Sequence, residues 1–182
     1  MLVILDRDGV INEDRTDFVK TPDELVFIDG ALSAISRLNK AGHTVVIATN
    51  QSCIGRGIIT TDTLTIIHQK LTKSLKAAGG WVDQIFFAPD APWEATNMRK
   101  PGDGMMKAAL NQFGAKPSNT VVIGDSLRDL QAAASSGCHR CLVQTGKGVK
   151  TQKEGLPRDI LPVAVAASLS EAVDFIEAGR FQ

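Results

Sequence analysis

The stretch that decides the fold runs Leu2-Val3-Ile4-Leu5-Asp6-Arg7-Asp8-Gly9-Val10. Its apolar first half is typical of a strand that is buried on both faces, as in a parallel sheet between two layers of helices. Asp6 and Asp8 follow at the carboxyl end of this strand, and the turn-forming Gly9 comes directly after them. Ligands bind at that end of the strands in open α/β sheets. The stretch therefore predicts both a parallel sheet and a polar site at its edge.

The negative charges of two neighbouring carboxylates such as Asp6 and Asp8 repel each other and must be offset. At a separation of about 4 Å they repel each other by roughly 4 kcal/mol at an effective dielectric constant of 20. Such a pair requires a nearby cation, or one of its members must hold a proton. The alternative is that Asp6 and Asp8 only solvate a loop, which is the usual role of an isolated D-x-D. The polar residues that follow the other strands favour the first interpretation.

The composition is that of an ordinary globular domain. The chain has 182 residues, of which 43% are hydrophobic and 22% are charged. Lys plus Arg equals Asp plus Glu at 20 each, so the chain has no excess positive charge that would attract nucleic acid or a membrane surface. No apolar run reaches the roughly 20 residues of a membrane span, and no signal-peptide pattern is present. The 3 cysteines do not form a disulfide framework. We expect one cytoplasmic domain over residues 1–182, as a monomer or small homo-oligomer without nucleic-acid or membrane partners.

Apolar runs alternate with helical patterns along the chain, which predicts right-handed crossovers and a mostly parallel sheet. Strands are expected at 2–5, 44–48, 82–88, 120–124 and 140–144, with a short segment at 163–165. Helices are expected at 30–41, 104–113, 125–136 and 170–178, and a long one is expected between a cap at Thr60 or Thr61 and a stop at 78–80. The polar segments 12–22, 89–101 and 145–157 read as loops, and the first two are candidates to cover the site. The expected fold class is α/β: a three-layer Rossmann-like domain with no large cap domain.

Polar signals follow four of the predicted strands, and they matter more together than alone. They are Asp6-x-Asp8, Thr49-Asn50, Arg99-Lys100 and Gly124-Asp125-x-x-x-Asp129. Three carboxylates that meet at one sheet edge form an oxygen-rich pocket for a hard cation, and Mg²⁺ is the expected one. A metal there would cancel the repulsion and bind a phosphoryl oxygen, while Thr49 and Lys100 would hold the others. The pattern predicts hydrolysis of a phosphate monoester, in which most of the catalytic effort is charge stabilisation.

This ordered set resembles the haloacid dehalogenase superfamily, in the phosphatase branch whose D-x-D-G motif carries a second acid. The resemblance implies Asp6 as the nucleophile that forms an aspartyl-phosphate and Asp8 as the general acid/base. It implies Thr49 and Lys100 as phosphoryl stabilisers. Mg²⁺ would bind Asp6, Asp125 and the backbone carbonyl of Asp8. We expect the remaining acid, at position 129, to support the site from behind or to cap its helix.

A closer resemblance covers nearly the whole chain. Segments 6–12, 49–52, 55–57, 99–101 and 142–146 are similar to the D-glycero-D-manno-heptose 1,7-bisphosphate 7-phosphatase family, which serves bacterial surface polysaccharide synthesis. The resemblance implies removal of the 7-phosphate of a small bisphosphorylated sugar. Carried over by position, the substrate contacts are Asp14, Arg15, Thr16, Asp17, Asn50, Gln51, Ser52, Arg56, Arg99 and Ser126. The arginine at position 99 suits a substrate with a second phosphate, because guanidinium binds phosphate bidentately.

The sequence departs from that family at two places. Many members carry a cysteine- and histidine-rich zinc loop before the Arg-Lys-Pro segment, whereas residues 89–98 contain neither residue type, so no structural Zn²⁺ is expected. This loop is then either held by packing of Trp93 and the loop prolines or mobile. Cys53 stands where the family has glycine, and it would be strained if its φ were positive. The Cys138-x-x-Cys141 pair is expected to be reduced and partly buried, and His68 to be a partly buried helix residue rather than a ligand.

Two alternatives stay open. Histidinol-phosphate phosphatase and other small sugar-phosphate phosphatases share the catalytic set, although Asn12 and the Gly55-Arg56-Gly57 segment favour the heptose enzyme. A receiver-like signalling module also has an acidic Mg²⁺ pocket and a phosphorylated aspartate, but it stores the phosphoryl group. Asp8 disfavours that class, because it supplies a base for hydrolysis two residues after the nucleophile.

Overall fold

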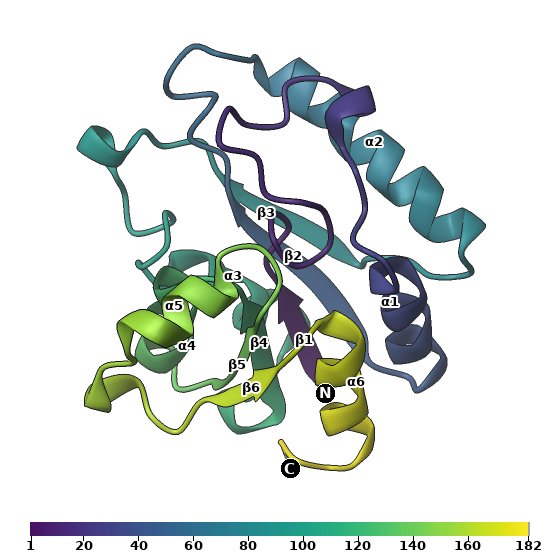
Figure 1. The fold of residues 1–182 in the computed structure, drawn as a ribbon, viewed down its shortest axis with the longest axis vertical. Helices are drawn as coiled ribbons and strands as arrows, with labels where there is room; N and C mark the ends of the chain where they lie inside the picture. Colours follow the sequence, from purple (N-terminus) through teal and green to yellow (C-terminus); the bar gives the residue numbers. More distant parts are fainter. Residues whose placement is uncertain (182) are drawn as a thin grey trace.

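The computed structural model describes residues 1–181 and places a six-stranded sheet between layers of helices (Figure 1). The strands are β1 (Leu2–Leu5), β2 (Thr44–Asn50), β3 (Gln84–Ala88), β4 (Thr120–Gly124), β5 (His139–Val143) and β6 (Ala164–Ala166). They pair in parallel in the order β3-β2-β1-β4-β5-β6. The order reverses at β1, so the crevice outside its carboxyl end lies at a topological switch point. The predicted α/β class, its parallel sheet and the lack of a large cap domain are confirmed.

Side chains alternate between the two faces of the sheet. Val3 and Leu5 join the apolar cluster that includes α1 (Ala31–Lys40), α2 (Thr61–Ala77) and α6 (Leu169–Glu177). Leu2 and Ile4 join the cluster on the opposite face with α3 (Gly104–Phe113) and α4 (Leu127–Ser135). All four residues of β1 are at most 2% exposed. The central strand is therefore buried on both faces, as its continuous apolar run predicts.

One helix was not expected from the sequence. Residues 145–157 were predicted as a polar loop, but α5 (Gly148–Glu154) lies within them. Only Gly148 and Thr151 of this helix are buried, so it has no apolar stripe that a periodicity argument could detect. A tertiary contact holds it, because the Thr151 hydroxyl donates to the Asp125 carbonyl at 2.9 Å.

Local details of the prediction have mixed outcomes. The Thr60 hydroxyl caps α2 by accepting from the Thr63 amide at 3.1 Å, whereas the sequence left Thr60 and Thr61 as equal candidates for this cap. The third strand begins at Gln84 rather than at position 82. Strain at Cys53 is absent, because within residues 1–181 Phe18 is the one non-glycine residue with positive φ. The three cysteines are buried and free; Cys138 and Cys141, expected to be reduced and partly buried, are almost fully buried.

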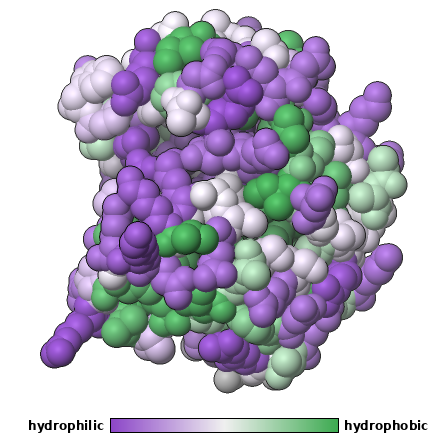
Figure 2. Space-filling view, viewed as in Figure 1, coloured by the Kyte–Doolittle hydropathy of each residue, from purple (hydrophilic) through white to green (hydrophobic). Residues whose placement is uncertain are grey.

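The surface carries no sign of a membrane segment. Among residues 1–181, no helix combines the length and the apolar character that crossing a membrane requires. Figure 2 shows one face on which hydrophilic residues dominate and apolar residues form small separate patches, which is usual for a globular surface.

The buried strand provides a test of the core. We expect Ile4→Ala to lower the free energy of unfolding by about 2–5 kcal/mol, because Ile4 is 0% exposed and the central strand cannot close the cavity. The matched control is Ile66→Ala on α2, where the side chain is 53% exposed and the expected change is within about 0.5 kcal/mol. Urea denaturation of both variants measures the difference. Equal effects would contradict the assigned burial.

Candidate active site

A pocket of about 400 Å³ opens at the carboxyl ends of β1, β2 and β4. The sequence-predicted residues in its wall are Asp6, Asp8, Asp14, Arg15, Thr16, Asn50, Gln51, Ser52, Arg56, Arg99, Lys100, Asp125 and Ser126. The wall also contains residues that the sequence did not single out for the site, among them Arg7, Arg128 and Lys147. The topology therefore brings together signals spread over some 120 positions of the chain.

Two predicted residues lie outside this wall. Thr49 is 0% exposed and sits behind Gln51, whose side-chain amide donates to the Thr49 hydroxyl at 2.8 Å. Asp17 points into solvent and pairs with Arg15 and Lys20 of its own loop. A contact of Asp17 with a ligand in the pocket is thus not part of this arrangement. Motif position alone does not reveal which way a loop side chain turns.

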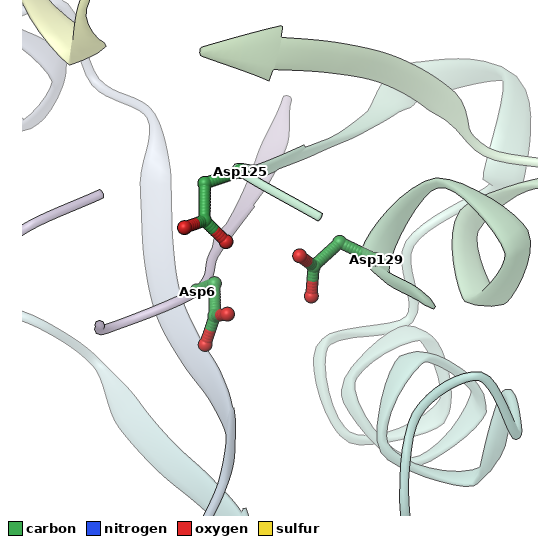
Figure 3. Close-up of side chains that lie close together, drawn as sticks. All are labelled: Asp6, Asp125 and Asp129. Atoms are coloured by element: carbon green, nitrogen blue, oxygen red, sulfur yellow. The ribbon is translucent and has the colours of Figure 1, made fainter. Parts of the chain in front are cut away.

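Three carboxylates meet at the floor of the pocket (Figure 3). Asp6 follows β1, Asp125 follows β4 and Asp129 lies in the first turn of α4; one oxygen of each is within 4.8 Å of the others. Burial raises the pKa of Asp6 to about 8, and the neighbouring carboxylates add to this while Lys100 opposes it. Burial also raises the pKa of Asp125 to about 6, with a further contribution from Asp129. Such a concentration of oxygen ligands is typical of a site for a hard divalent cation.

Lys100 lies within this cluster and is 2% exposed. Its ammonium group is 3.0 Å from Asp6 Oδ1 and 2.5 Å from Asp129 Oδ1, and it donates to the Ala48 carbonyl at 2.7 Å. Burial alone would lower the pKa of Lys100, but the two carboxylates outweigh it and raise the pKa. The side chain of Asn50 holds the Lys100 backbone, accepting from its amide at 3.0 Å and donating to its carbonyl at 2.9 Å. Asn50, predicted as a substrate contact, thus fixes the lysine.

Asp8 lies beside the cluster and receives three hydrogen bonds. Its Oδ1 accepts from Arg7 Nη2 and from Asn12 Nδ2, each at 2.9 Å, and its Oδ2 accepts from Gln51 Nε2 at 2.9 Å. Burial would raise the pKa of Asp8, but the charge of Arg7 and these hydrogen bonds outweigh it and lower the pKa. Asp6 and Asp8 are therefore opposite in character, since the first favours the protonated form and the second the charged form.

Asp129 has both of the roles considered from the sequence. Its Oδ2 accepts from the Ser126 amide at 3.0 Å and from the Ser126 hydroxyl at 2.5 Å, forming a capping box at the start of α4. Its Oδ1 faces Lys100. Ser126, predicted as a substrate contact, is engaged in this cap, although it also lines the pocket. The carboxylate supports the cluster from behind while it begins the helix.

Glycines make this close approach possible. A Cβ at Gly9 or Gly146 would lie 2.0 or 2.2 Å from Asp125 Oδ2, and both residues have positive φ, 83° and 56°. Asp125 Oδ2 also accepts from the Lys147 amide at 2.8 Å. The loop after β5 therefore helps to position a carboxylate that is 22 residues away in the chain. Sequence reasoning recognised Gly9 as a turn residue, but it did not assign a role to Gly146.

Hydrogen bonds close the 89–98 loop, which the sequence analysis expected to be mobile or held by packing of Trp93 and prolines. Asp90 Oδ2 accepts from the Thr96 amide at 2.8 Å and from its hydroxyl at 2.5 Å. Trp93 is 66% exposed, so the expectation that it holds the loop by burial is wrong. It instead stacks with the Arg56 guanidinium, which lies 5.0 Å from its ring centroid and 5.9 Å from that of Phe18. Arg56 thus connects the two loops that border the pocket.

Cations dominate the outer part of the pocket. Arg56, Arg99, Arg128 and Lys147 all line it. Burial lowers the pKa of Arg99, and the charges of Arg128 and Arg56 lower it further, so these guanidinium groups are near one another. Arg99 Nη1 donates to a backbone carbonyl, that of Asp90, at 3.1 Å. Several like charges that share one cavity favour an anionic ligand.

The chain is similar to known phosphatases along most of its length. Residues 97–172 match a family model described as HAD-hydrolase-like. A D-glycero-beta-D-manno-heptose-1,7-bisphosphate 7-phosphatase from Bordetella bronchiseptica is 49% identical over 154 residues, covering 85% of this chain and 86% of the relative. An enzyme of the same name from Pseudomonas aeruginosa is 41% identical over 172 residues, covering 94% of this chain and 97% of the relative.

Solved structures give the same result. The D,D-heptose 1,7-bisphosphate phosphatase of B. bronchiseptica, complexed with magnesium and phosphate, superimposes with a TM-score of 0.93 at 44% identity, covering 98% of each chain. The corresponding enzyme of Burkholderia thailandensis gives a TM-score of 0.74 at 44% identity, covering 96% of this chain and 97% of the other. The protein is therefore a phosphatase of the haloacid dehalogenase superfamily, and it belongs to the D-glycero-D-manno-heptose-1,7-bisphosphate 7-phosphatase family.

Proposed function

We propose that this phosphatase removes the 7-phosphate of D-glycero-D-manno-heptose 1,7-bisphosphate through an aspartyl-phosphate intermediate. The observation that carries the proposal is one pocket with a carboxylate and lysine cluster at its floor and the guanidinium groups of Arg56, Arg99 and Arg128 at its mouth. A bisphosphorylated sugar matches this arrangement, since one phosphate can react at the floor while the other binds the arginines. Relatives named for this activity, at 41–49% identity, support the same substrate.

The carboxylate cluster fits a Mg²⁺ ion. Asp6 and Asp125, with the backbone carbonyl of Asp8, would hold it; Asp129 is left to neutralise Lys100. When bound, the ion neutralises the carboxylates and withdraws charge from a phosphoryl oxygen. The relative from B. bronchiseptica was crystallised with magnesium and phosphate, which supports this choice of metal. Mg²⁺, the cofactor that the sequence predicts, is therefore the metal that we propose for this site.

The chemistry then divides between Asp6 and Asp8. It requires an ionised Asp6 and a protonated Asp8, the reverse of the preferences that the two side chains have without the cation, so the proton that leaves Asp6 must be replaced by one taken up on Asp8. An Asp6 carboxylate oxygen then bonds to phosphorus while the bond from phosphorus to the sugar oxygen breaks, and Asp8 donates its proton to that oxygen. Asp8 next takes a proton from water, the water oxygen bonds to phosphorus, and the bond to Asp6 breaks to release phosphate. Lys100, 3.0 Å from Asp6, would bind a phosphoryl oxygen. Thr49 is fully buried and accepts a hydrogen bond from Gln51, so its contact with a phosphoryl oxygen stays a prediction.

The substrate assignment has a direct test. With Mg²⁺, kcat/KM for both anomers of heptose 1,7-bisphosphate is expected to exceed that for histidinol phosphate and common sugar phosphates by at least about a hundredfold, because only a bisphosphate uses both ends of the pocket. Phosphate release from this panel measures it. A flat profile, or a preference for histidinol phosphate, would overturn the heptose substrate while leaving the phosphatase assignment in place.

The catalytic roles have their own variants. Asp6→Asn is expected to abolish turnover, and Asp8→Asn to reduce kcat about 10²- to 10⁴-fold through loss of the proton transfer. Asp23→Asn, at an exposed position outside the pocket, is the matched control and should retain full activity. Stoichiometric phosphorylation of the wild type without turnover would instead favour a receiver-like module.

Binding of Mg²⁺ should depend on pH. The metal can bind Asp6 and Asp125 only after their protons leave, and their pKa values are about 8 and about 6. Because the proton competes with the cation, affinity should rise as pH increases from 6 to 8, by up to about tenfold per pH unit for each proton released. The Mg²⁺-induced increase in Tm at each pH measures this. Equal affinity at both pH values would contradict the ligand assignment, and Asp125→Asn should remove most of the increase.

Lys100 should matter for stability as well as for activity. Lys100→Met leaves two buried carboxylates without their cation, so we expect a loss of roughly 3–5 kcal/mol of folding free energy. Lys107→Met is the control, because its side chain is 60% exposed while it pairs with Asp103 at 2.7 Å, and the expected loss is within about 1 kcal/mol. Chemical denaturation distinguishes the two, and similar losses would refute the buried pairing.

A further inference from the structure

Arg7 is a buried charge that the proposed chemistry does not use. Its side chain is 1% exposed, and its Nη2 donates to Asp8 Oδ1 at 2.9 Å. Burying a guanidinium group is costly unless its charge is paired and its N–H groups have acceptors. The partners of Arg7 therefore indicate what this side chain does in the site.

The second partner of Arg7 is a histidine on a helix. Arg7 Nη1 lies 3.3 Å from His68 Nε2, and 61 positions separate the two residues in the sequence. Because a guanidinium group can only donate, Nε2 must accept, so the His68 ring is neutral with its proton on Nδ1. Burial, followed by the charge of Arg7, lowers the pKa of His68 to about 4, in agreement with a neutral ring. The edge of Phe87 on β3 contacts the same ring, with centroids 6.3 Å apart.

The alternation of β1 explains why these residues meet. Val3 and Leu5 face the layer that contains α2, and Arg7 continues this alternation just beyond the strand end. Asp6 and Asp8 have the opposite parity and line the pocket. Arg7 is thus the residue that spans from the helix layer to the acid at the pocket.

We propose that His68 and Arg7 are positioning residues for Asp8: His68 anchors Arg7 to α2, and Arg7 fixes the Asp8 carboxylate for proton transfer. Asn12 and Gln51 also donate to Asp8, each at 2.9 Å, but both are neutral amides from neighbouring loops. Arg7 alone among the three brings a charge and a second contact to a helix. This inference rests on the proposed role of Asp8 as the general acid.

Such a role has a kinetic signature that a loss of stability does not produce. A sugar alkoxide needs a proton as it leaves, whereas p-nitrophenolate is stable without one. The parameter kcat/KM covers the steps through departure of the leaving group and is therefore not affected by the later attack of water. A poorly positioned Asp8 should slow the sugar ester selectively.

The experiment compares kcat/KM for heptose 1,7-bisphosphate, or for the best sugar phosphate of the panel, with kcat/KM for p-nitrophenyl phosphate. His68→Leu removes the acceptor, and His68→Gln retains one. Arg7→Lys keeps the charge but cannot reach both partners with a fork of donors. Gln69→Leu alters the exposed neighbour of His68 on the same helix and serves as the matched control. Circular dichroism and thermal denaturation establish which variants are folded.

We expect His68→Leu and Arg7→Lys to lose about tenfold in kcat/KM for the sugar ester and less than about twofold for p-nitrophenyl phosphate. The tenfold loss is smaller than the loss expected when the acid Asp8 itself is removed, because a poorly positioned acid still transfers some protons. His68→Gln and Gln69→Leu should remain within about twofold of wild type for both esters. Equal losses for the two esters, no loss, or a His68→Gln variant as impaired as His68→Leu would overturn the proposal. If one of the two impaired variants does not fold, the other provides the test.

Asp8→Asn separates this proposal from the one on which it rests. It should lose far more with the sugar ester than with p-nitrophenyl phosphate. If it does so while the folded His68 and Arg7 variants do not, only the positioning role is overturned. If Asp8→Asn shows no preference between the esters, the acid role of Asp8 fails, and the positioning role fails with it.

Discussion

The buried ammonium group of Lys100 is the interaction on which the site depends. It lies between Asp6 and Asp129 and also donates to the Ala48 carbonyl, so one charge joins the ends of β1 and β2 to the first turn of α4. Three carboxylates with little solvent exposure could not lie within 4.8 Å of one another unless a positive charge such as this ammonium group offset their repulsion. The cluster is therefore a consequence of burying one lysine at the point where the strand order reverses.

Space is the second constraint. The carboxylates reach one another only because Gly9, Gly124 and Gly146 leave room; at Gly124 a Cβ would lie 2.2 Å from that of Asp129. The Lys147 amide then holds Asp125 from the loop after β5. Charge compensation and the absence of side chains at these positions act together, since neither alone would allow a compact acidic cluster.

Rigid and adaptable parts are separated in this phosphatase. The acids follow β1 and β4 or lie on α4, and Lys100, which comes from the turn before α3, is held by the Asn50 side chain at the end of β2. The cations of the mouth come mostly from the surrounding loops, where Arg56 stacks between Phe18 and Trp93 and Lys147 pairs with Asp14 at 2.7 Å. Reaction type thus depends on the sheet, whereas recognition depends on segments that can differ between relatives.

The sequence by itself determined the sheet and most of the residues that line the pocket. The apolar run before Asp6, the acids after two strands and the position of Lys100 are enough, because parallel strands must bring their carboxyl ends to one edge. Only the tertiary structure decided which donor meets which acceptor. Contacts such as Arg7 with His68, or the Lys147 amide with Asp125, join residues 61 and 22 positions apart, and no periodicity encodes them. For the same reason the sequence did not predict three further features: α5, the orientation of Asp17 into solvent and the burial of Thr49. Each of them depends on three-dimensional packing rather than on a local sequence pattern.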